Sequence, residues 1–192
     1  MRKIIVSMMV SVDGYIEDSN NNIDWHVWDT EMERYMLGFF ERVDTMLFGR
    51  KTYQLMESFW PTEAGSESPL IAAKMNGLPK IVFSTTLTDA RWDTTKLVHE
   101  VDAKAIIAMK EQPGKDMVIF GGANLVSSFR ELDLIDEYHL VTNPVALGAG
   151  TSLFKTMAGQ LALKLVSTQS FACGNVLITY QPLNTKGDNR NI

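Results

Sequence analysis

Residues 117–125 read Met-Val-Ile-Phe-Gly-Gly-Ala-Asn-Leu, and this stretch is the strongest indication of the fold. The apolar run from Met117 to Phe120 predicts a short buried strand, and residues 124–131 predict a helix. Gly121 and Gly122 lie between the two. Because glycine has no Cβ, such a pair lets the backbone approach a pyrophosphate closely. The stretch therefore indicates a nucleotide-facing turn, with a plain tight strand–helix turn as the alternative.

Two other predicted strand ends share this design. Phe48 is followed by Gly49-Arg50-Lys51-Thr52, and Phe83 is followed by Ser84-Thr85-Thr86. In an open α/β sheet, ligands bind beyond the carboxyl ends of the strands, where helix N-termini favour phosphate. Arg50 and Lys51 fall in the first turn of a predicted helix, where cations oppose the helix dipole unless an anion lies between them. The loops predict a phosphate site, and a solvated basic turn is the alternative.

The rest of the chain supports an α/β fold. Strands alternate with helices over the first two-thirds, which predicts a mainly parallel sheet. The expected strands are 3–12, 45–48, 80–83, 96–99, 117–120 and 137–142, and the expected helices are 29–42, 50–59, 102–111 and 124–131. Two final strands, 161–171 and 175–181, joined by a turn at 172–174, predict an antiparallel edge at the C-terminal end. We expect one domain over residues 1–183, an exposed loop at 62–69 and a flexible tail at 184–192.

Composition narrows the partners. The chain has 192 residues, a formal net charge of -5 and one cysteine, Cys173, so it has no internal disulfide. The negative charge argues against nucleic acid and anionic membranes, and no apolar run is long enough to cross a bilayer. The three histidines are scattered and predict no metal site. We expect a cytoplasmic protein with a small-molecule ligand, without nucleic-acid or membrane partners.

Several motifs in order resemble the dihydrofolate reductase superfamily. They are Ser11-Val12-Asp13-Gly14-Tyr15-Ile16, Asp24-Trp25, Phe48 to Tyr53, and Phe120-Gly121-Gly122. The block from Leu134 to Leu140, with Pro144 and Leu147 to Phe154, is similar to the RibD C-terminal domain, the reductase half of bifunctional riboflavin biosynthesis enzymes. The resemblance covers about residues 3–181. It implies a three-layer α/β/α fold of the dihydrofolate reductase type, with NADPH lying across the strand ends.

The resemblance also implies roles for single residues. Gly49, Arg50, Lys51 and Thr52 would contact cofactor phosphates, and Ser84 and Thr85 would lie near the adenosine 2′-phosphate. Gly121, Gly122, Ala123 and Asn124 would hold the pyrophosphate. The segment 12–25 would form a mobile loop over the nicotinamide.

The implied reaction is hydride transfer from NADPH to a ribosylamino-pyrimidine phosphate or a similar substrate, as in 5-amino-6-(5-phosphoribosylamino)uracil reductase. Asp13, at the end of the first strand, is the predicted catalytic group, with a turn-forming role before Gly14 as the alternative. Trp25, Asp29 and Glu31 are predicted substrate contacts. Their alternatives are core packing for the tryptophan and a favourable first-turn charge for the two carboxylates. Trp28 and Phe59 are further aromatic candidates for stacking on a flat ring.

Two other functions are compatible with the sequence. Dihydrofolate reductases place a carboxylate a few residues after the loop tryptophan, and Thr30 stands at the matching position here. This departure disfavours folate reduction without excluding it. A non-catalytic nucleotide-binding protein with the same fold is the other alternative. The apolar C-terminal strands and the resemblance also predict a homodimer.

Overall fold

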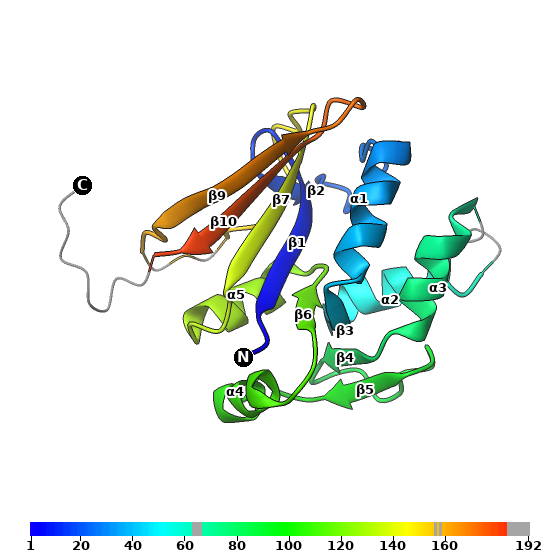
Figure 1. Ribbon diagram of the computed structural model, residues 1–192, viewed down its shortest axis with the longest axis vertical. Helices are drawn as coiled ribbons and strands as arrows, with labels where there is room; N and C mark the ends of the chain where they lie inside the picture. The colour runs from blue at the N-terminus through cyan, green and yellow to red at the C-terminus, as the bar shows by residue number, and fades with distance from the viewer. Residues whose placement is uncertain (63–66, 156, 158, 184–192) are drawn as a thin grey trace.

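A central sheet of eight strands organises the computed structural model, which describes residues 1–62, 67–155, 157 and 159–183 (Figure 1). Its order is β5 (Thr95–Val98), β4 (Lys80–Phe83), β3 (Val43–Gly49), β6 (Asp116–Ile119), β1 (Ile4–Ser11), β7 (Glu137–Asn143), β10 (Val176–Pro182), β9 (Leu163–Ser170). The strands from β5 to β7 are parallel, whereas β10 is antiparallel to β7 and to β9. The predicted mostly parallel sheet with an antiparallel C-terminal edge is confirmed.

Helices cover both faces of the sheet and make three layers (Figure 1). α4 (Ala103–Glu111) and α5 (Ala123–Glu131) pack on one face, and α1 (Thr30–Phe40), α2 (Arg50–Phe59) and α3 (Pro69–Gly77) pack on the other. Along β1, Ile4 and Val6 join the first core while Ile5 joins the second. This alternation explains why β1 is apolar along nearly its whole length. Among the described residues, none of the helices has the length and apolar character that crossing a bilayer requires.

Two features differ from the sequence-based expectation. α3 was not predicted. It is a short helix that begins at Pro69, and its apolar residues do not form a single buried face, since Leu70 is exposed while Ile71 and Met75 are buried. The buried ammonium of Lys80 stabilises the end of α3 by donating to the carbonyls of Asn76 and Leu78. A second, two-stranded sheet joins β2 (Tyr15–Glu17) to β8 (Thr151–Ser152). The predicted tail at 184–192 and part of the 62–69 loop lie outside the described residues.

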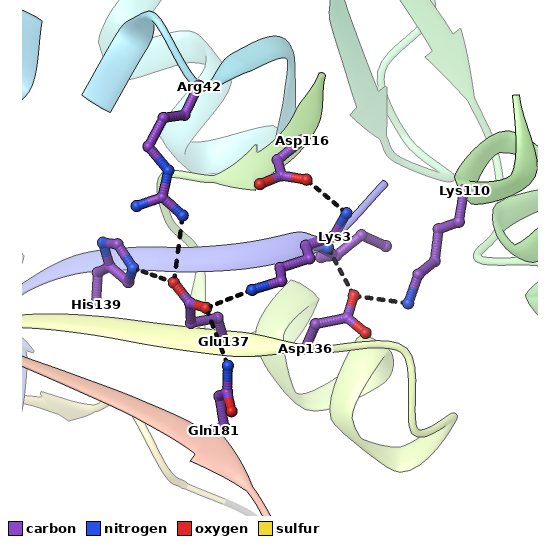
Figure 2. A network of polar contacts seen from close by, with 9 residues as sticks. Lys3, Arg42, Lys110, Asp116, Asp136, Glu137, His139 and Gln181 are labelled. Carbon is purple, nitrogen blue, oxygen red and sulfur yellow. Dashed lines mark hydrogen bonds and ion pairs between the residues drawn. The ribbon is translucent and has the colours of Figure 1, made fainter. Parts of the chain in front are cut away.

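A buried polar network holds the amino-terminal ends of β1 and β7 together (Figure 2). Glu137, the first residue of β7, accepts from His139 at 2.6 Å and from Lys3 at 3.0 Å, with the Arg42 guanidinium 3.6 Å away. The neighbouring Asp136 accepts from the backbone N–H of Ile4 at 2.7 Å and pairs with Lys110 at 2.6 Å. Because β1 and β7 are parallel, this network lies at the sheet edge opposite to their carboxyl ends.

Candidate functional site

A cleft of about 1260 Å³ lies at the carboxyl ends of β4, β3 and β6. These three strands are neighbours and parallel, so the loops that follow them open at one edge of the sheet. All ten residues predicted to bind the cofactor line this cleft: Gly49, Arg50, Lys51, Thr52, Ser84, Thr85, Gly121, Gly122, Ala123 and Asn124. The structure thus brings the three predicted phosphate loops together.

Two helices begin at this edge without a side-chain cap. The N-cap residues of α2 and α5 are Gly49 and Gly122, and neither supplies a capping hydrogen bond. Away from this edge, Asp29 caps α1 and Asp102 caps α4 by accepting from a backbone N–H at 2.8 and 2.9 Å. The first N–H groups of α2 and α5 are therefore left for another acceptor, and an anion satisfies both the donors and the dipole.

The glycine pair sits against the first turn of α2. Gly122 has φ of 91°, a conformation that favours glycine. A Cβ on Gly121 would lie 2.8 Å from Cγ2 and 2.9 Å from Oγ1 of Thr52. The sequence thus needs glycine at both positions to keep the β6–α5 turn close to α2, and this close approach shapes a cradle of backbone atoms.

The Ser84–Thr85 loop extends the same edge beyond β4. The Ser84 hydroxyl is buried and accepts from the backbone N–H of Leu87 at 2.9 Å and of Thr86 at 3.2 Å. It therefore shapes the turn, whereas Thr85 is exposed at the cleft. The two hydroxyls thus have different environments although they are adjacent in the sequence.

The other half of the cleft is apolar. α1 contributes methionines and a phenylalanine at helical spacing, α3 contributes two buried apolar residues, and the later turns of α2 complete the wall. These residues are Met32, Met36, Phe40, Leu55, Met56, Phe59, Ile71 and Met75, with Trp28 and Trp60 beside them. Apart from Trp28 and Phe59, sequence reasoning did not single them out, because apolar residues at helical spacing ordinarily indicate core.

The residues predicted to bind substrate lie elsewhere. Asp29 and Glu31 accept from the backbone N–H groups of Cys173 and Ala172, each at 2.9 Å, and so fix the β9–β10 turn to α1. The hydrogen bond from Met32, which caps α1, is the first cause of a lowered pKa at Asp29. The Trp25 indole donates to the carbonyl of Asn22 at 3.1 Å. None of the three residues is in the lining of the cleft.

Asp13 lies just after the end of β1, as expected, and outside the lining of the cleft. Its carboxylate accepts from the Ser11 hydroxyl at 2.6 Å and from the N–H groups of Gly148 and Leu147 at 2.7 and 3.1 Å. These hydrogen bonds, that of Ser11 first, lower the pKa of Asp13 to about 2. The Asp13 carboxylate thus ties the end of β1 to the loop at 147–148.

His26 was not predicted as a site residue, yet it lines the cleft. Its Nε2 is buried and has no hydrogen-bond partner among the described residues. Burial lowers the pKa of His26 to about 4, so the imidazole is neutral at pH 7. Its position directly after Asp24-Trp25 was the only sequence signal available. Within the described part of the chain, no three His, Cys, Asp or Glu side chains gather as a metal site requires.

The layers and the cleft define an α/β/α protein with a large cleft at the carboxyl ends of the strands of a mostly parallel sheet. The chain belongs to the RibD C-terminal domain family, whose model matches residues 2–177. The uncharacterized protein YyaP of Bacillus subtilis is 33% identical over 180 residues, covering 93% of this chain and 94% of that protein.

Two solved structures share the fold of this chain. A protein from Shewanella sp. PV-4, provisionally named a riboflavin biosynthesis protein, is 25% identical with a TM-score of 0.74, covering 95% of this chain and 99% of that one. Dihydrofolate reductase from Enterococcus faecalis, in complex with NADP(H), shares the fold at 18% identity with a TM-score of 0.63, covering 94% and 96%. The predicted family and the dihydrofolate reductase-like fold are confirmed.

Proposed function

We propose that the chain is an NADPH-dependent reductase of the RibD type, with the cofactor in the cleft at the ends of β4, β3 and β6. One observation carries this proposal: two uncapped helix N-termini and a glycine cradle meet at neighbouring strand ends. That arrangement suits the adjacent phosphates of a dinucleotide. The ten residues that line these loops are the proposed cofactor contacts.

The cleft is large enough for a cofactor and a second small molecule. Pockets for one small ligand usually measure roughly 300–1,000 Å³, and this cleft measures about 1260 Å³. The strand order suggests an orientation, with the 2′-phosphate at Ser84 and Thr85, the pyrophosphate near the glycine pair, and the nicotinamide toward β1, where Ser7, Met8 and Met9 line the cleft. When bound, NADPH supplies a hydride for a C=N or C=O carbon of the second molecule.

The residues of the chain would bind and orient the cofactor and the substrate. Arg50 and Lys51 are exposed at the first turn of α2, where each can pair with a cofactor phosphate. The apolar wall would exclude water from the reacting atoms once a substrate covers it. Folate reduction is the weaker alternative, because α1 presents Met32, Met36 and Phe40 to the cleft and no carboxylate.

The test is a fluorescence titration with NADPH and NADH, followed by an assay of NADPH oxidation. We expect saturable binding with a preference for NADPH. Absence of binding at millimolar cofactor would refute the proposal. Binding without oxidation by riboflavin-pathway pyrimidines, dihydrofolate or flat carbonyl and imine compounds would favour a non-catalytic nucleotide-binding protein.

We also propose that the protein is a homodimer that pairs through β9. This strand is an edge of the sheet, and its residues are exposed from Lys164 to Ser170. Leu165 and Val166 are 54% and 49% exposed. Long exposed edge strands with apolar side chains are usually covered in native proteins, and a second copy is a suitable cover.

A further inference from the structure

The lining of the cleft changes character along α2. Its first turn presents Arg50, Lys51 and Thr52, which belong to the proposed cofactor site. Its later turns present Leu55, Met56 and Phe59. Within their bounds α1 and α3 add only apolar residues to the lining, and the N-cap residue of α3, Ser68, and its neighbour Glu67 lie beside them. The boundary between the cofactor half and the remaining half therefore falls within one helix.

The charges in the lining favour no second anion. Among the described lining residues the cations are Arg50, Lys51 and Lys155. The first two lie at the cofactor loop, and the carbonyl of Lys155 accepts from Ser127 of α5, on the opposite face of the sheet from α1 and α3. Five carboxylates line the same cleft: Glu17, Asp24, Glu67, Glu100 and Glu131. A phosphate held beside α1 and α3 would meet no cation from these helices.

The apolar half leaves large side chains open to solvent. Trp28, Leu55 and Phe59 are 43%, 46% and 43% exposed, although all three line the cleft. A flat ring would cover this surface, and methionines such as Met36 and Met56 adapt well to an irregular ring edge.

We propose that the second molecule in the cleft, the substrate of the reductase, is a flat apolar or heteroaromatic ring compound without a phosphate group. This inference rests on the proposed function and departs from the ribosylamino-pyrimidine phosphate that the family resemblance implies. The juxtaposition that carries it is an exposed apolar wall on α1, α2 and α3 that has no cation of its own.

The experiment compares one ring with and without a phosphate. The protein is saturated with NADP⁺, so that Arg50 and Lys51 are occupied, and is titrated in a calorimeter with 2-naphthol and with 2-naphthyl phosphate. We expect 2-naphthol to bind at least about tenfold more tightly, a difference of about 1.4 kcal/mol. Equal or tighter binding of the phosphate ester, or no binding of 2-naphthol, would overturn the inference and leave the cofactor proposal standing.

A matched pair of variants tests the location. Leu55→Lys places a cation on the apolar wall, and we expect it to weaken 2-naphthol binding and strengthen phosphate ester binding. Leu70→Lys makes the same change at a 62% exposed residue of α3 outside the lining, and we expect neither affinity to change. An equal response of both variants contradicts the proposed location.

If NADP⁺ does not bind, the cofactor proposal fails separately. The same titrations on the Arg50→Ala/Lys51→Ala variant then still decide the ring preference.

Discussion

Gly121 lies where two loops of the cleft touch. A Cβ at this position would fall 2.8 Å from Thr52 Cγ2, which is shorter than a van der Waals contact. We expect Gly121→Ala to push the β6–α5 turn from α2 and to weaken NADPH binding by about tenfold or more, as overpacking commonly costs about 1–3 kcal/mol. A fluorescence titration measures the loss.

Gly38 provides the control for this change. It lies exposed within α1, and a Cβ there meets nothing within 4 Å. Gly38→Ala should leave NADPH binding unchanged and raise the free energy of unfolding by about 0.5–1 kcal/mol, because alanine is the better helix former. Unchanged NADPH affinity in Gly121→Ala would contradict the proposed cradle.

Glu137 is expected to contribute to the stability of the fold and not to ligand binding in the cleft. The hydrogen bond from His139, followed by that from Lys3, lowers its pKa from the ordinary 4.5 to about 2 (Figure 2). We expect Glu137→Gln to lower the free energy of unfolding at pH 7 by about 1–3 kcal/mol, since charge-assisted hydrogen bonds are lost. NADPH affinity at pH 7 should not change, because the network lies at the opposite edge of the sheet.

The sign of the pH dependence follows from the lowered pKa of Glu137. A carboxyl group whose pKa is lower in the folded than in the unfolded state stabilises the folded protein. This contribution is complete when the pH is above the unfolded-state pKa. The stability difference between wild type and Glu137→Gln should therefore be largest above pH 4.5 and shrink as the pH falls toward about 2. Urea unfolding of both proteins at pH 7 and at the lowest pH at which they stay folded measures this stability difference. Glu41→Gln removes a surface pair with Lys74 and should show little change, whereas equal losses in both variants would contradict the buried network.

Secondary-structure elements were the best-predicted level of the molecule. The predicted bounds of α2 and β4 match the structure, because glycine, proline and hydroxyl residues mark their ends. The three phosphate loops could be placed together because parallel strands end at the same edge. The hydrogen bonds that Asp29 and Glu31 accept from the turn at 172–173 could not be predicted, since an Asp that caps a helix and an Asp that binds substrate look alike locally. The partner of Asp29, Cys173, lies 144 residues away in sequence.

Two cations, Arg50 and Lys51, lie in the first turn of α2. Lys51 lies there without a nearby capping carboxylate, so the folded protein tolerates an unfavourable charge that a phosphate would relieve. Lys51→Ala should weaken NADPH binding by about tenfold or more and raise the free energy of unfolding by about 0.3–1 kcal/mol. Arg50→Ala should weaken binding similarly.

Lys104 offers a matched control, because it occupies the corresponding first turn of α4 outside the cleft. Lys104→Ala should leave NADPH affinity unchanged and give little gain in stability, because the Asp102 carboxylate that caps α4 already offsets the charge of Lys104. Titration and urea unfolding of both variants measure the two effects. Equal NADPH affinity in Lys51→Ala and Lys104→Ala would contradict the phosphate role of α2.

The whole molecule has its cleft and its exposed edge strand at different places. The cleft opens at the ends of β4, β3 and β6 and reaches β1 and Val141 of β7, whereas β10 separates β7 from β9 in the sheet. Pairing of two copies through β9 is therefore compatible with an open cleft in each copy. The second copy would cover Leu165 and Val166, which are exposed in the single chain.

Leu165→Lys tests this assembly. A lysine here replaces an exposed apolar side chain by a charge on each of the paired edges, so we expect the dissociation constant of the dimer to rise by about tenfold or more. Sedimentation velocity over a range of protein concentrations measures it. Ile107→Lys, at a 45% exposed residue of α4 away from β9, should sediment like the wild type. A monomeric wild type, or an unchanged Leu165→Lys, would contradict the proposal. NADPH affinity should be equal in all three proteins, because Leu165 and Ile107 lie outside the lining of the cleft.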